Sequence, residues 1–167
     1  MENQSRGYGT VALRVLAWIC RLGIGGLFVV AGYTKLRSPF MFEMAVDAYR
    51  ILPPFGVIVV ARSLPWLEVV LGLLLIAGWK LRYFSSFAAL LVAGFVGVMA
   101  FTYSRGVEAN CGCFGFGEKI SPLTLARDSV FLVLALYLAA YSWMEWKRKS
   151  KAGTRESMSV DHSAKPE

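Results

Sequence analysis

Hydrophobic residues gather in four long stretches separated by short polar segments, at residues 11–33, 55–79, 83–103 and 123–146. Each stretch is close to the length of about 20 residues with which an α-helix crosses the hydrocarbon core of a bilayer. Lipid offers no hydrogen-bond partner to a peptide backbone, so stretches of this kind must be helical. The pattern predicts an all-α fold, an integral membrane bundle of four transmembrane helices.

The first stretch allows a second interpretation. Arg14 and Arg21 interrupt it, and residues 22–31 resemble the apolar region of a signal peptide, with Val29 and Ala31 forming a candidate cleavage site. Cleavage would leave three spans and place the basic C-terminal tail on the far side of the membrane, against the positive-inside rule. We therefore expect the first helix to be retained.

A short helix is predicted between the first two spans. Ser38 suits the N-cap position and Pro39 the first helical position, and polar residues then recur at helical spacing. This polar stripe consists of Glu43, Asp47 and Arg50. We expect the helix to lie in the outer membrane interface with the stripe toward water, and to end before Pro53 and Pro54.

Composition supports the membrane interpretation, since 56% of the 167 residues are hydrophobic and the mean hydropathy is +0.53. The net charge of +7 does not indicate nucleic-acid binding, because six of the 18 basic residues lie in the last 21 positions, where anionic lipid headgroups are the expected counter-charge. This tail, residues 147–167, is rich in charge and serine, so we expect it to be disordered.

The distribution of Lys and Arg predicts the orientation of the chain in the membrane. Eleven lie at one set of helix ends and in the tail, against seven at the other set. Positive charge favours the cytoplasmic side, so residues 1–10 and the tail are predicted to be cytoplasmic. The connection at residues 104–121 then faces the periplasm or exterior of a bacterial inner membrane, where disulfides persist.

That connection contains the most informative motif, Cys111-Gly112-Cys113. Two cysteines separated by one glycine can close only a very small ring, which the glycine makes feasible, and such a strained disulfide is easily reduced. Arg105 and Lys119 flank the pair and, if close, favour the thiolate that exchange requires. The motif indicates a redox pair, with a structural disulfide or an inert thiol pair as the alternatives.

A metal site is not expected at this motif. It offers two sulfur ligands, and His162, the single histidine, is far away in the tail. Cys20, the third cysteine, falls inside the first span and is expected to be a packing thiol, because a free cysteine behaves as a small hydrophobe.

Glu68 lies near the middle of the second span, where a lone carboxylate needs a partner or a proton. Arg21 falls at a comparable depth in the first span and is predicted to pair with it, with Lys35, reaching inward from the outer end, as the alternative partner. Such a pair is either a structural ion pair or part of a proton relay.

Asp128 lies near the start of the last span, after a probable cap formed by Ser121 and Pro122. Its position close to the cysteine motif suits proton handling during thiol exchange. An acidic side chain near a helix N-terminus is also simply stabilising, so both interpretations stay open.

Three motifs together resemble a known family. They are residues 110–115, Asn-Cys-Gly-Cys-Phe-Gly, residues 31–36, Ala-Gly-Tyr-Thr-Lys-Leu, and residues 64–68, Leu-Pro-Trp-Leu-Glu. Over about residues 10–146 the chain resembles the MauE branch of the DoxX-like membrane proteins. The resemblance implies four membrane helices and a part in maturing the disulfide-rich small subunit of periplasmic methylamine dehydrogenase, together with a thioredoxin-like protein.

Three functions remain in competition. The first is a membrane thiol-disulfide factor that acts through Cys111 and Cys113 on a periplasmic thioredoxin-like protein or a disulfide-containing client. The second is a non-catalytic assembly scaffold, and the third, with least support because no inverted repeat is apparent, is a small-solute transporter.

No cofactor is expected. The Cys-x-Cys spacing departs from the Cys-x-x-Cys of the DsbB and vitamin K epoxide reductase folds, so quinone chemistry cannot be carried over from them, although quinone is not excluded.

Overall fold

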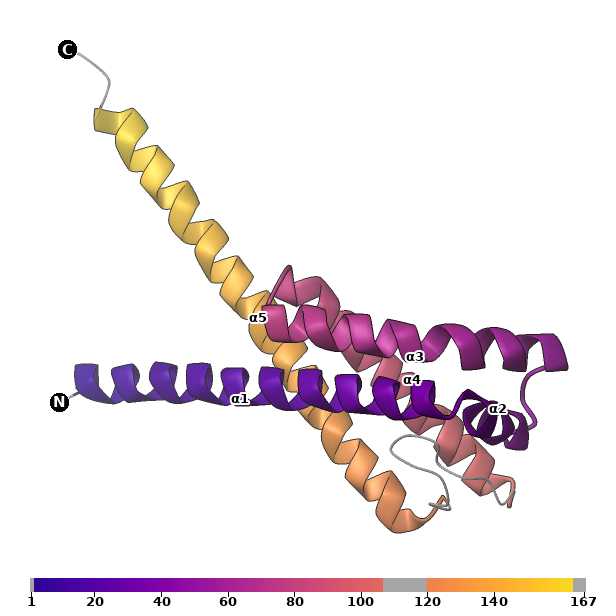
Figure 1. Cartoon of the computed structure of the whole chain (residues 1–167). Coiled ribbons are helices and arrows are strands. Elements are labelled where there is room, and N and C mark those ends of the chain that lie inside the picture. Colours follow the sequence, from indigo (N-terminus) through magenta and orange to yellow (C-terminus); the bar gives the residue numbers. More distant parts are fainter. Residues whose placement is uncertain (1, 107–119, 164–167) are drawn as a thin grey trace.

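The computed structural model is all-helical across the residues that it describes, 2–106 and 120–163, with side chains described for 13–106 and 120–150 (Figure 1). The all-α fold class is confirmed. In chain order the helices are α1 (Glu2–Arg37), α2 (Pro39–Ala48), α3 (Pro54–Ala77), α4 (Leu81–Ser104) and α5 (Pro122–Ser163).

Four of these helices contain segments long and apolar enough to cross a membrane, which confirms the four predicted spans. The segments are Leu13–Arg37, Pro54–Ala77, Leu81–Ser104 and Pro122–Ser150. The chain is therefore a multi-pass membrane protein. The exposure of large apolar side chains such as Ile19, Leu90 and Val133, each more than 60% exposed, fits a surface that meets lipid rather than water.

The predicted short helix is α2. It begins at Pro39, buries Phe42 and Ala45 against the bundle and leaves Asp47 exposed, which agrees with an amphipathic helix at the interface. Ser38 occupies the N-cap position but makes no side-chain hydrogen bond there. The proline alone therefore favours the start of this helix, through its fixed φ.

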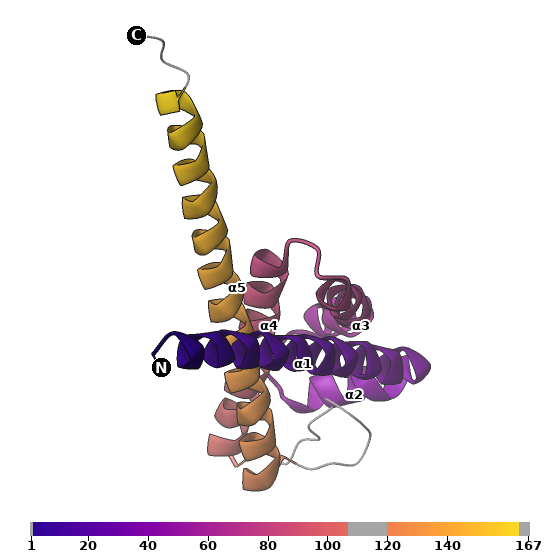
Figure 2. The ribbon, with the colours of Figure 1, turned by 90° about the vertical axis from the view of Figure 1, so that its left-hand side faces the viewer.

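Both ends of the chain are more helical than expected. α1 begins at Glu2 rather than near residue 11, and α5 continues to Ser163, where disorder was expected from residue 147. The physical reason is that extending an existing helix adds one hydrogen bond per residue and avoids the cost of nucleation. α5 therefore projects well beyond the other helices (Figures 1 and 2).

The bundle consists of two closely packed helix pairs, α1 with α3 and α4 with α5 (Figure 1). Glycines bring the first pair together: a Cβ atom on Gly72 would lie 2.6 Å from the Gly25 carbonyl oxygen, and one on Gly32 would lie 2.7 Å from the Pro65 carbonyl oxygen. Small residues permit this close approach of membrane helices.

The core lies where the two pairs meet. It includes Cys20 and Phe28 from α1, Leu75 from α3, Ala89 from α4 and Leu138 from α5. Cys20 is a free thiol with 5% of its surface exposed, as expected for a packing residue. Phe28 belongs to the segment that resembles a signal peptide, and that segment is an integral part of the helical core.

One end of the bundle gathers the features that matter below. There α1 ends, α2 lies across the bundle, α4 ends and α5 begins, and we call this the α2 end (Figure 1). The opposite end holds the turn between α3 and α4 and the N-terminal part of α1 (Figure 1).

Candidate functional site

The centre of the site is a buried ion pair between α1 and α3. Lys35 and Glu68 are 3% and 2% exposed, and the Lys35 Nζ donates a hydrogen bond to the Glu68 Oε1 at 2.5 Å. The predicted pairing of Glu68 with Arg21 is therefore wrong, and the alternative partner is the observed one. The two helices are neighbours, as that prediction required.

The direction of the side chains explains the choice of partner. In an α-helix every Cα–Cβ bond tilts toward the N-terminus. α1 runs toward the α2 end, so Lys35 tilts back toward the middle of the bundle, whereas α3 runs the other way and Glu68 tilts toward Lys35. Arg21 tilts away from Glu68, toward the opposite end.

Arg21 instead caps the C-terminus of α3. Its Nε donates to the Leu75 carbonyl oxygen at 2.8 Å and its Nη2 to the Ile76 carbonyl oxygen at 2.5 Å. These carbonyls belong to the last turn of α3, where helices lack partners for such groups. The guanidinium also lies 4.4 Å from the centre of the Trp18 ring and fills the space beside Gly78, whose φ is 74°.

A small cavity joins the ion pair to a second carboxylate. It has a volume of about 50 Å³, and its polar lining residues are Lys35, Glu68 and Asp128, from three different helices. Asp128 is 5% exposed, and the Glu68 Oε2 is buried with no hydrogen-bond partner among the described residues. Residues that the sequence placed in two separate groups therefore line one cavity, which is large enough to hold water.

Asp128 reaches this cavity because of how α5 begins. The Ser121 Oγ accepts a hydrogen bond from the Thr124 backbone N–H at 3.2 Å, and Pro122 opens the helix, so the predicted N-terminus is confirmed. Asp128 follows less than two turns later, and the Arg127 Nε lies 3.1 Å from its Oδ1. This helix start thus directs a carboxylate from the α2 end into the bundle.

The cysteine motif itself falls in the connection between α4 and α5. Cys111, Cys113 and Lys119 lie outside the described residues. Arg105 is described at the end of α4, where it is exposed and its Cζ lies 5.5 Å from the centre of the Phe101 ring. α4 ends and α5 begins at the α2 end, so the two helices that the connection joins both meet it at that end of the bundle (Figure 1).

Comparison with known proteins identifies the family. A family model described as methylamine utilisation protein MauE matches residues 13–141. The chain belongs to the MauE family. The resemblance seen in the sequence motifs is thereby confirmed, over the four spans and the cysteine connection.

Three curated proteins are similar in sequence to this chain over most of its length. The chain is 32% identical to methylamine utilization protein MauE of Paracoccus denitrificans, over 75% of this chain and 69% of that protein. It is also 32% identical to methylamine utilization protein MauE of Methylophilus methylotrophus, over 76% and 65%. Protein TlpB of Flavobacterium psychrophilum is 28% identical over 84% of this chain, which spans 38% of that longer protein. No solved structure matches the chain.

Sequence reasoning underestimated Lys35. Residue counting from the helix ends placed Arg21 and Glu68 at comparable depth, but α1 packs on α3 with Gly25 against Gly72, which sets Arg21 beside the end of α3. The tilt of side chains toward the helix N-terminus separates Arg21 from Glu68 further and turns Lys35 toward it. It also missed the meeting of Glu68 with Asp128, which requires the packing of α5 against the α1 and α3 pair. Nothing in the spacing along one helix indicates that arrangement.

Proposed function

We propose that this MauE family member is a membrane thiol-disulfide factor, in which Cys111 and Cys113 exchange disulfides with a periplasmic thioredoxin-like protein or with a client being matured. The observation that carries the proposal is the Cys-Gly-Cys motif in the connection between two membrane spans. Two thiols held this close can form, pass on and resolve a disulfide within one short segment.

The exchange has two covalent steps. The thiolate of one cysteine attacks a sulfur of the partner's disulfide, which forms a mixed disulfide and releases the partner's other sulfur as a thiolate. The second cysteine of the motif then attacks the mixed disulfide, closes Cys111–Cys113 and frees the partner in its dithiol form. The reverse sequence delivers a disulfide to a reduced client, so the same pair serves either direction.

The residues around the motif have supporting roles in this proposal. Arg105 and Lys119 flank the cysteines in sequence, and a nearby cation favours the thiolate. Asp128 follows the connection closely, and its carboxylate is suited to exchange protons at the α2 end. The pair of Lys35 with Glu68 anchors α1 to α3 beneath this region.

The proposed location is the bacterial inner membrane, with both termini in the cytoplasm and the cysteine connection in the periplasm. An even number of spans puts both termini on one side, and the excess of Lys and Arg at those ends supports the cytoplasm as that side. The periplasm is where disulfides are made and kept.

Two of the relatives are named for methylamine utilisation. A disulfide-containing periplasmic enzyme of methylamine oxidation is therefore the first client to test. Where the genome around this chain offers another cysteine-rich secreted enzyme, the same chemistry applies to that client.

Trapping of the mixed disulfide tests the proposal. Cys111→Ser and Cys113→Ser should each abolish client maturation, and one of the two should accumulate a covalent adduct with a periplasmic protein, because the thiol that resolves the intermediate is missing. The adduct is detected by non-reducing electrophoresis and mass spectrometry. Cys20→Ser is the matched control, because this thiol is buried in the core, and it should retain activity.

Full activity of a double Cys111→Ser, Cys113→Ser variant would eliminate the redox proposal in favour of the assembly scaffold. Loss of the folded protein in both single variants, with no adduct, would instead show that the pair is a structural clip.

A further inference from the structure

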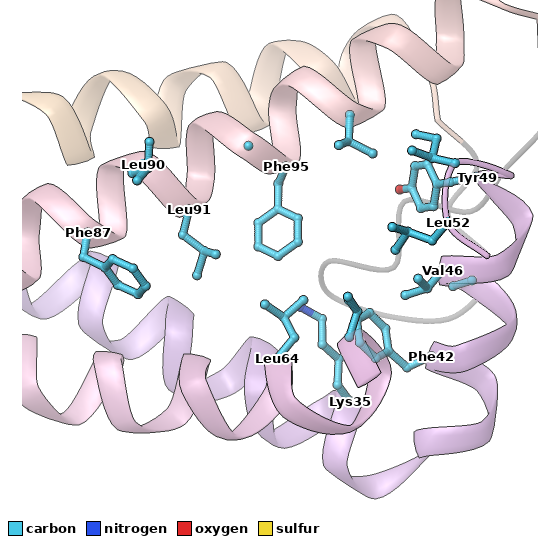
Figure 3. Close-up of a pocket in the computed structure, with 15 residues that line it drawn as sticks. Lys35, Phe42, Val46, Tyr49, Leu52, Leu64, Phe87, Leu90, Leu91 and Phe95 are labelled. Carbon is cyan, nitrogen blue, oxygen red and sulfur yellow. The ribbon is translucent and has the colours of Figure 1, made fainter. Parts of the chain in front are cut away.

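Lys35 also lines a second, much larger cavity (Figure 3). This cavity has a volume of about 380 Å³ and lies between α2, α3 and α4. Its walls are formed almost entirely by apolar side chains, including Phe42, Leu64, Leu91 and Phe95. Figure 3 shows the Lys35 side chain rising between Leu64 and Phe42, with its nitrogen turned toward Phe95.

The cavity is long enough to suit a chain-like ligand. Along α4 its lining extends from Phe87 to Val98, a rise of about 16 Å for a helix. Tyr49 and Leu52 lie at the α2 end of the cavity and Phe87 at the other (Figure 3). A ligand here would run from the membrane interface toward the middle of the bilayer.

The Lys35 ammonium, the charged group in this apolar cavity, limits the kind of ligand that can bind there. An ammonium has three hydrogen-bond donors, and the Lys35 Nζ uses one of them for the Glu68 Oε1. Since Glu68 already balances the charge, an anionic ligand would add an uncompensated charge to a buried site. A neutral carbonyl oxygen accepts a hydrogen bond from the ammonium without changing the charge.

Aromatic rings surround the same nitrogen. The Lys35 Nζ lies 5.0 Å from the centre of the Phe42 ring and 5.2 Å from that of Phe95. Such rings offer faces and edges for packing against a flat, unsaturated ring. The cavity therefore combines a site for a planar carbonyl compound with a long apolar channel for its tail.

We infer that this cavity binds a prenylated quinone of the membrane, with a ring carbonyl on Lys35 and the tail along α4, and that the quinone accepts electrons from the cysteine pair. The inference rests on the proposed function in the direction that delivers a disulfide to a reduced client, because that delivery leaves the motif as a dithiol and a two-electron acceptor must re-oxidise it. As Cys111 and Cys113 form their S–S bond, two S–H bonds break and two protons and two electrons are released. The quinone takes up both protons and both electrons and becomes a hydroquinone with two new O–H bonds.

A phospholipid acyl chain is the rival occupant. It would cover the apolar walls equally well, but it would offer no acceptor to the donors of the ammonium that the Glu68 Oε1 does not use. Competition binding distinguishes the two occupants, because phospholipid should fully displace quinone only if the cavity is an acyl-chain site.

A glycine pair on α4 provides the decisive variants. Gly94 lines the cavity, and a Cβ atom added there would meet no described atom within 4 Å, so the side chain of Gly94→Phe starts in open space beside the cavity and can occupy part of it. Gly97 lies on the same helix with the same open space but does not line the cavity, so Gly97→Phe is the matched control.

Binding is measured with the full-length chain in nanodiscs, carrying Cys111→Ser and Cys113→Ser so that thiol chemistry plays no part. The probe is a short-chain ubiquinone analogue. We expect saturable binding that Gly94→Phe weakens at least about tenfold, because the tail loses buried apolar area, while Gly97→Phe leaves it unchanged. No saturable binding, equal effects of the two phenylalanines, or full displacement by phospholipid would overturn the assignment.

Electron transfer is measured with the intact cysteine pair. The reduced protein should convert one quinone for every two thiols lost, and Gly94→Phe should slow this conversion while exchange with a thioredoxin-like protein continues. Thiol exchange without quinone reduction would overturn the quinone assignment and leave the proposed function standing. Quinone binding without any thiol exchange would overturn the proposed function and, with it, the electron transfer described here.

Discussion

At the scale of residues, the pairing of Lys35 with Glu68 shows how a membrane bundle tolerates charge in its interior. Both side chains are almost completely buried, and the charge of each partly offsets the desolvation cost of the other. Replacing one partner alone exposes the full desolvation cost of the other, whereas replacing both by apolar residues is often neutral.

Glu68→Ala should therefore lower the free energy of unfolding by about 3–5 kcal/mol, because it leaves the Lys35 ammonium buried and uncompensated. Stability is measured by denaturant titration in detergent micelles. The double variant Lys35→Met, Glu68→Leu should recover most of the loss, and Asp47→Ala, at an exposed position of α2, should change little. Equal losses for Glu68→Ala and Asp47→Ala would contradict a buried pair.

Part of this site could be predicted from the sequence. The hydrophobicity of the second span made it clear that Glu68 needs a partner, and Lys35 was among the candidates. The depth assigned to Arg21 was wrong: Gly25 lies against Gly72, so Arg21 is level with the last turn of α3 and meets the backbone of Leu75 and Ile76. Depth along a helix depends on residue count, whereas contact also depends on side-chain direction and helix rotation.

At the scale of elements, the contact between α1 and α3 depends on glycines. Gly72 and Gly25 face each other so closely that a side chain on Gly72 would meet the backbone of α1. Backbone atoms cannot move aside as a side chain can, so the helices must separate to admit a larger residue.

Gly72→Leu should destabilise the bundle by about 1–3 kcal/mol or more, as overpacking of a tight contact does. Thermal unfolding of the purified protein in detergent would measure the change. Gly23→Leu is the matched control, because a Cβ atom at Gly23 meets no described atom within 4 Å. If both substitutions had the same effect, the loss would come from glycine chemistry in general and not from this contact.

The sequence indicated close packing but could not assign it. The first span contains four glycines close together, of which Gly25 and Gly32 meet α3, while Gly23 and Gly26 have open space beside them. In the third span, small residues recur at intervals of four, and these are likewise divided, since Ala89 is buried and Gly97 is exposed. Small residues show where helices are able to approach, and the packing of the whole bundle decides which of them do.

At the scale of the whole molecule, the main question is which face of the membrane carries the cysteine connection. A maleimide reagent that cannot cross membranes should label Cys111 or Cys113 in intact spheroplasts after mild reduction. Cys20 should remain unlabelled because it is buried in the core, and a Cys111→Ser, Cys113→Ser variant provides that control. Labelling only after the membrane is disrupted would reverse the orientation and remove the oxidising compartment from the proposed function.

Overall architecture was the most predictable level, because the length and apolarity of the spans follow directly from the thickness of a bilayer. The pairing of α1 with α3 and α4 with α5, and the two cavities that meet at Lys35, were beyond reach. They arise from contacts between residues far apart in the chain, for which one sequence contains no direct signal.

The contact of Arg21 with the end of α3 has a consequence for how the protein is made. Two carbonyls in the last turn of α3, those of Leu75 and Ile76, accept hydrogen bonds from a residue synthesised more than fifty positions earlier. These two bonds join the end of α3 to α1, so they form only once the first helix lies beside it. Insertion in chain order, from the ribosome outward, supplies that helix at the right moment, and a chain whose first span was released or inverted would leave the turn to α4 unsupported.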